Sequence, residues 1–89
     1  MKKKIAILGS TGSIGKSTLD IIIKDINSFD IVLLYANNSY LKLIEQAKKF
    51  NVRNVVIKNK KFYAQVCSAL KKTKTKVFTG DIPIDKIIT

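Results

Sequence analysis

The sequence has no histidine and a single cysteine, Cys67. A lone thiol cannot form an internal disulfide, and a zinc site built from Cys and His is excluded. We therefore expect a reducing, cytoplasmic setting. Long apolar runs are also missing, because no stretch approaches the roughly 18 residues that a membrane-spanning helix needs. The N-terminal run from Ile5 to Leu8 is too short for the core of a signal peptide, which predicts a soluble protein that is not exported.

Proline and glycine are scarce, with one Pro and four Gly among 89 residues. Apolar residues make up 46% of the chain, so a disordered or collagen-like protein is excluded. A chain of this length forms at most one domain and buries only somewhat over 60% of the surface that its unfolded form exposes. The sequence contains no internal repeat and no linker, and we expect residues 1–89 to form part of one domain.

Acidic residues are few: six stand against 17 basic residues, for a net charge of +11. Such an excess raises the hypothesis of a nucleic-acid-binding surface. However, Arg53 is the only arginine, although arginine is the residue of bidentate phosphate and base recognition. Lys, Ile and Asn are abundant together, which is typical of proteins from AT-rich genomes. We interpret the charge as compositional drift, and keep a basic nucleotide- or nucleic-acid-binding module as an alternative.

Apolar runs of strand length occur at residues 4–8, 30–35, 54–57 and 76–80, and helical periodicity follows each of the first three. Strands that alternate with helices predict βαβ units, parallel pairing and right-handed crossovers. The expected class is α/β: a partial Rossmann-like, doubly wound fold with a mainly parallel sheet of three or four strands. Ser13 or Ser10 is expected to cap the first helix, and the tail after residue 80 is ambiguous.

The first strand is central in doubly wound sheets, so we expect one edge of residues 5–8 to be left unpaired in this chain. Long apolar edges promote aggregation. This predicts that the chain is a piece of a larger protein and that it self-associates when isolated.

The stretch LGSTGSIGKST, from Leu8 to Thr18, combines two phosphate-binding patterns. A P-loop that ends at Gly15-Lys16-Ser17 would need glycine where Ser10 stands, and no predicted strand ends in the acid that helps to hold Mg²⁺. A dinucleotide turn fits better, because the glycines at 9, 12 and 15 lie between a strand and a helix. They would allow a tight turn, close approach to a pyrophosphate and close packing of helix on sheet, respectively.

The end of the second strand reads Tyr35-Ala36-Asn37-Asn38 and lacks the acid that binds the ribose diol of NAD. This absence favours NADP, although no Arg or Lys stands in the turn to pair with a 2′-phosphate. Lys42, Lys58 and Lys60 are candidate substitutes. For Asn37 and Asn38, a role as ordinary turn residues and a role as ligand contacts explain the sequence equally well.

The segments ILGSTGSIGKSTLDIII, FDIVLLYANNSYLKLIEQAKKF and RNVVI resemble the N-terminus of 1-deoxy-D-xylulose 5-phosphate reductoisomerase. That family makes 2-C-methyl-D-erythritol 4-phosphate for isoprenoid synthesis, with NADPH and a divalent metal, Mg²⁺ or Mn²⁺. The resemblance implies that residues 1–89 are the N-terminal part of an NADPH-binding domain of a cytoplasmic, homodimeric oxidoreductase, with no membrane partner and no nucleic-acid partner.

The resemblance also implies specific cofactor contacts: Thr11, Gly12, Ser13 and Ile14. The family's second turn usually reads Ala-Gly-Lys/Arg-Asn, and its last three positions are here Asn37, Asn38 and Ser39, which puts the strength and selectivity of NADPH binding in question. The family's metal ligands, substrate-phosphate residues and catalytic loop lie further along a much longer chain. We therefore expect no catalytic residue and no metal ligand here, and no turnover by this chain alone; a P-loop phosphotransferase fragment is the third hypothesis.

Overall fold

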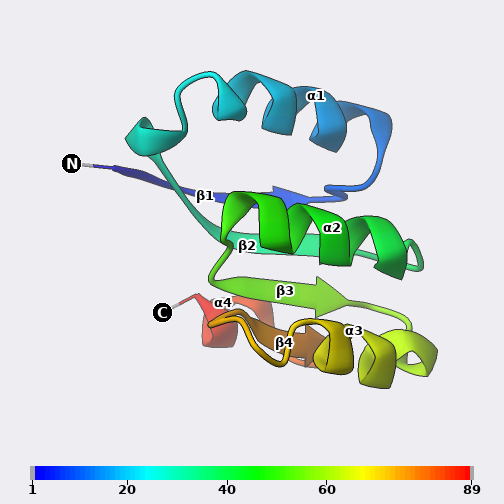
Figure 1. Ribbon diagram of the computed structural model, residues 1–89. Helices are drawn as coiled ribbons and strands as arrows, with labels where there is room; N and C mark the ends of the chain where they lie inside the picture. The colour runs from blue at the N-terminus through cyan, green and yellow to red at the C-terminus, as the bar shows by residue number, and fades with distance from the viewer. Residues whose placement is uncertain (1, 89) are drawn as a thin grey trace.

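Four strands alternate with helices along the chain in the computed structural model, which describes residues 2–88 (Figure 1). Two short 3₁₀ turns, η1 and η2, interrupt this alternation. The elements are β1 (Lys3–Leu8), α1 (Ser13–Ile23), η1 (Ile26–Ser28), β2 (Phe29–Ala36), α2 (Tyr40–Phe50), β3 (Asn54–Ile57), η2 (Lys60–Phe62), α3 (Tyr63–Ala69), β4 (Lys76–Thr79) and α4 (Ile84–Ile87).

The sheet has the order β1-β2-β3-β4, and all three strand pairs are parallel. Right-handed crossovers between successive neighbours place their helices on one face, and Figure 1 shows α1, α2 and α3 over that face, with α4 behind β4. The predicted α/β class with alternating helices is confirmed. The strand order runs in one direction through residues 2–88, and the ambiguous tail forms α4.

The core lies between the sheet and the helices. Leu34, Val55 and Ile57 are fully buried and belong to the same apolar cluster as Leu43 on α2 and Val66 on α3. Full burial of such a side chain contributes roughly 1.5–3 kcal/mol. β3 is buried along its whole length, as expected for a strand with parallel neighbours on both sides and cover on both faces. The buried central strands therefore fix the positions of the turns that follow them.

The start of α1 differs from the sequence-based expectation. The N-cap position is occupied by Gly12, and no side chain caps the helix. Ser13 is already the first helical residue, one position too late to accept from the first N–H groups. Ser10 is completely buried in the preceding turn. The predicted serine cap was therefore wrong, because the glycine turn places a residue without a side chain at the capping position.

β1 pairs with β2 on one side only, so it forms an edge of the sheet described by residues 2–88. This confirms the unpaired edge that was expected from the fold class. Apolar side chains are exposed on β1 and on the helix that follows it: Leu8 at the end of β1 is 62% exposed, and Ile21 on α1 is 68% exposed. An apolar edge of this kind invites pairing with another chain.

We predict that the isolated chain self-associates through β1, and that Leu8→Lys weakens dimerisation several-fold because it places a charge beside the open edge. Leu41→Lys is the matched control, since Leu41 on α2 is 67% exposed but distant in sequence from this strand. Sedimentation velocity across a concentration series measures the effect. A chain that stays monomeric at high concentration, or an equal effect of both variants, contradicts the prediction.

Candidate functional site

The turn between β1 and α1 folds back against the end of β2. The N–H groups of Gly9 and Ser10 both donate to the Tyr35 carbonyl, at 2.8 and 3.1 Å, and the N–H of Gly12 donates to the Gly9 carbonyl at 3.0 Å. Gly9 has φ of +74°, a conformation that other residues rarely adopt. The first glycine therefore makes the tight exit from the strand that the sequence predicts for it.

Gly15 is where α1 touches this turn most closely. A Cβ atom at Gly15 would lie 2.6 Å from Ser10 Cα and 2.8 Å from Ser10 C, and closer still to the Gly9 carbonyl oxygen. All three atoms belong to the backbone, so no side-chain movement could relieve the contact. The absence of a side chain at position 15 allows the helix to begin directly against the turn.

The remaining turn residues are open to solvent. Gly12, Ser13 and Ile14 are exposed, and Thr11 is half-buried. The N–H groups of Ser13 and Ile14 lie in the first turn of α1, where a helix offers them no acceptor. Together with the helix dipole they form a partial positive charge that suits a phosphate. No acidic residue occurs between residues 9 and 18, so the turn has the polarity and the open backbone that a pyrophosphate requires.

The second turn, between β2 and α2, lies at the same edge of the sheet because β1 and β2 are parallel. Asn37, Asn38 and Ser39 are all exposed. Asn59, from the loop after β3, donates its Nδ2 to Asn38 Oδ1 at 2.8 Å, and its backbone N–H donates to the Asn37 carbonyl at 3.0 Å. The structure thus brings the seven predicted cofactor residues to one edge, on two turns joined through the Tyr35 carbonyl.

Gln46 is a residue that the sequence did not reveal. Its side-chain Nε2 donates to the Ser10 carbonyl at 2.8 Å, from 36 positions further along the chain. The bond ties α2 to the glycine turn. Within the described residues, Ser10 Oγ and Gln46 Oε1 are buried without a hydrogen-bond partner. No local pattern could have found this contact, since Gln46 has the spacing of an ordinary helix residue.

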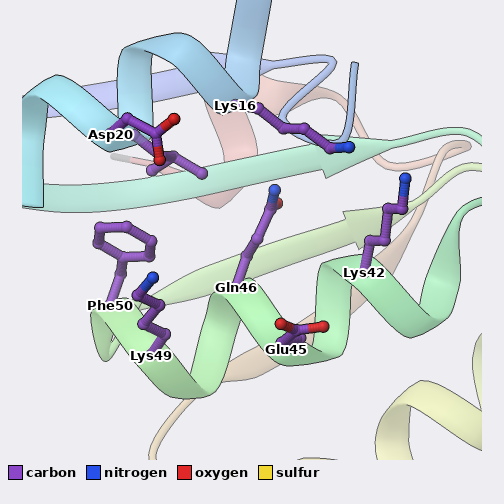
Figure 2. Close-up of a pocket in the computed structure, with 8 residues that line it drawn as sticks. Lys16, Asp20, Lys42, Glu45, Gln46, Lys49 and Phe50 are labelled. Carbon is purple, nitrogen blue, oxygen red and sulfur yellow. The ribbon is translucent and has the colours of Figure 1, made fainter. Parts of the chain in front are cut away.

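Lys16 extends from α1 toward Lys42 of α2, across a groove that also contains Asp20, Glu45 and Lys49 (Figure 2). Hydrogen bonding to Lys16 and repulsion by its ammonium group lower the pKa of Lys42, and partial desolvation adds to this, whereas Glu45 raises it. Lys16 is exposed and lines this groove together with Lys42.

Within residues 2–88, no group of three or more His, Cys, Asp or Glu side chains could hold a metal ion. Over the same residues, no helix is long and apolar enough to cross a membrane.

Comparison with known proteins links this geometry to one family. The family model described as 1-deoxy-D-xylulose 5-phosphate reductoisomerase matches residues 5–89. The reductoisomerase of Pelagibacter ubique is 48% identical over 85 residues, which cover 96% of this chain and 22% of that protein. The reductoisomerase of Porphyromonas gingivalis is 47% identical over 89 residues, which cover all of this chain and 23% of that protein. The chain therefore spans less than a quarter of the length of these relatives.

Solved structures agree with this likeness. The reductoisomerase of Zymomonas mobilis in complex with NADPH superposes with a TM-score of 0.87 at 31% identity, over 90% of this chain and 21% of that one. A reductoisomerase in complex with NADPH, fosmidomycin and magnesium superposes with a TM-score of 0.86 at 32% identity, over 96% of this chain and 21% of that one.

We predict that Gly15→Ala destabilises the chain by about 2 kcal/mol, since the added methyl group must displace backbone. Gly12→Ala is the control: its Cβ would lie 3.4 Å from the nearest atom, the Gly9 carbonyl oxygen, so it should cost about 1 kcal/mol or less, the loss of a glycine cap. Urea unfolding followed by circular dichroism gives both values. Equal stability of the two variants would show that the close approach at Gly15 is unimportant.

We predict that Lys16→Gln raises the pKa of Lys42 toward its ordinary value of 10.5, because it removes the neighbouring ammonium. The repulsion between the two ammonium groups acts at pH values below the folded pKa of Lys42, where Lys42 is charged, and it disappears as the pH rises through that pKa. Lys16→Gln should therefore remove the repulsion at neutral pH. NMR titration of the Lys42 side chain measures the shift. Lys48→Gln removes the same charge from an exposed position on α2 and should leave Lys42 unchanged; an unchanged Lys42 pKa in Lys16→Gln would refute the pairing.

Proposed function

Because the chain belongs to the 1-deoxy-D-xylulose 5-phosphate reductoisomerase family, we propose that it is the N-terminal NADPH-binding segment of such an enzyme, with residues 1–89 forming part of its Rossmann-like domain. The observation that carries the proposal is the glycine turn: Gly12 is exposed and directly precedes the first turn of α1, whose N–H groups have no acceptor within the helix. Relatives in this family have been solved with NADPH bound.

In this proposal the pyrophosphate of NADPH binds at Thr11, Gly12, Ser13 and Ile14, and the adenosine end lies against Asn37, Asn38 and Ser39. The turn supplies N–H donors and a helix dipole, and Gly12 allows the backbone to approach the phosphates closely. Gln46 acts as a positioning residue, since its bond to the Ser10 carbonyl holds the turn against α2.

The complete enzyme would reduce and rearrange 1-deoxy-D-xylulose 5-phosphate to 2-C-methyl-D-erythritol 4-phosphate, with NADPH as the hydride donor and Mg²⁺ or Mn²⁺ as the metal. Residues 1–89 would anchor the cofactor and would not turn over substrate alone. The metal ligands and the substrate-binding groups would come from other parts of the enzyme. Its cytoplasmic location and homodimeric state are further predictions that follow from the resemblance.

We predict that the chain binds NADPH, and that Gly12→Val abolishes binding while the fold is retained. The valine side chain would occupy the space where the backbone must approach the pyrophosphate. Because position 12 is exposed, the added side chain should not disturb the core. Titration followed by NADPH fluorescence measures affinity, and circular dichroism checks the fold. Ser68→Val, an exposed position on α3, is the control and should leave the affinity unchanged.

Two outcomes would contradict the proposal in favour of its rivals. Binding of ATP that depends on Mg²⁺ and on Lys16 would indicate a P-loop function. Binding of RNA or DNA with a steep salt dependence, unaffected by Gly12→Val, would indicate a basic nucleic-acid-binding module.

A further inference from the structure

The turn at the end of β2 lacks a cation. This is the position where dinucleotide-binding folds distinguish the free 2′-hydroxyl of NAD from the 2′-phosphate of NADP, by an acid for the first and a basic residue for the second. The turn here contains only Asn37, Asn38 and Ser39. A protein that binds NADPH at this turn must draw its positive charge from another part of the chain.

Two of the three nearby lysines are otherwise engaged. Lys60 Nζ lies 3.5 Å from Asp81 Oδ2, an ion pair at the surface. Lys42 lies in the groove between α1 and α2, where it faces Lys16 (Figure 2). Lys42 therefore lines that groove and is not among the residues that line the hollow beside Asn37 and Asn38.

Lys58 is placed differently. It directly follows β3, the strand beside β2, and its backbone N–H donates to the Ala36 carbonyl at 2.9 Å. It lines an open hollow of about 330 Å³ together with Asn37, Asn38 and Asn59. No acidic side chain lines this hollow, and none of the ion pairs found within residues 2–88 involves Lys58.

The stem of Lys58 lies against Gly80, just beyond β4. A Cβ atom at Gly80 would come within 2.9 Å of Lys58 Cγ and 3.2 Å of the Tyr35 hydroxyl. A glycine at this position therefore leaves the space that the methylene groups of Lys58 occupy. Lys58 is an exposed residue.

The asparagines complete a polar lining of defined orientation. Asn59 Oδ1 accepts from the Lys61 N–H at 3.0 Å, so the Asn59 amide nitrogen is the group that donates to Asn38 Oδ1 at 2.8 Å. Asn38 thus uses its carbonyl oxygen within the protein, and its NH₂ group stays available as a donor. A cation and an amide donor border the same hollow, which suits a phosphate monoester.

We propose that Lys58 is the cation that binds the adenosine 2′-phosphate of NADPH and sets the preference for NADPH over NADH. The proposal rests on the proposed function, because it assumes that the adenosine end of the dinucleotide lies at the β2 turn. The ammonium group supplies a point charge to the phosphate from β3, where the β2 turn has none.

The test compares NADPH with NADH, which differ only in the 2′-phosphate, on the 89-residue chain and its variants. Lys58→Gln should weaken NADPH binding about tenfold, the usual scale for a hydrogen bond to a charged group at an accessible site, and leave NADH binding unchanged. Lys58→Arg should retain the preference. Lys61→Gln is the control for net charge, since Lys61 is exposed and outside the hollow, and it should change neither affinity.

The outcomes separate this assignment from the proposed function. An equal loss of NADPH affinity in Lys58→Gln and Lys61→Gln would show a diffuse charge effect and overturn the role of Lys58. Unchanged discrimination in Lys58→Gln, or equal affinity of the unaltered chain for NADPH and NADH, would also overturn it and leave dinucleotide binding intact. Failure to bind either dinucleotide would overturn the proposed function, and the assignment with it.

Discussion

The contact between Gly15 and the backbone of residues 9 and 10 is the constraint on which the rest of the site depends. It allows α1 to begin directly against the strand exit, so that the first helical turn follows immediately on Gly12. The Tyr35 carbonyl then accepts two N–H groups of the turn and holds it against β2. Backbone geometry, more than any side chain, builds the cradle that we assign to pyrophosphate.

The parallel sheet extends this constraint to residues far apart in sequence. Since β1, β2 and β3 all run in one direction, the segments that follow them meet at one edge. The glycine turn, the asparagine turn and Lys58 are therefore neighbours in a row of strand ends. Gln46 adds a connection from the helix layer to the turn. Their joint placement is a property of strand direction and would be lost in an antiparallel arrangement.

The same sheet leaves apolar surface of this chain uncovered. β1 keeps one edge open, with exposed apolar side chains at Leu8 and on α1, and the relatives that the chain matches are more than four times as long. In the proposed function, the groups that react with substrate lie outside this segment. The charge of +11 is spread over many exposed lysines. We assign a ligand to one of them, Lys58.

The sequence by itself determined the α/β class, the four strands, and the separate roles of Gly9 and Gly15, because apolar periodicity and backbone freedom are local properties. It predicted a serine cap for α1 that was wrong, since the position of the cap depends on how the turn folds against β2. It named Lys42, Lys58 and Lys60 as equal candidates, and only the tertiary structure separated them through Lys16, Asp81 and Gly80. Contacts such as Gln46 with Ser10 arise when distant segments pack together, and no spacing in a single sequence encodes that distance.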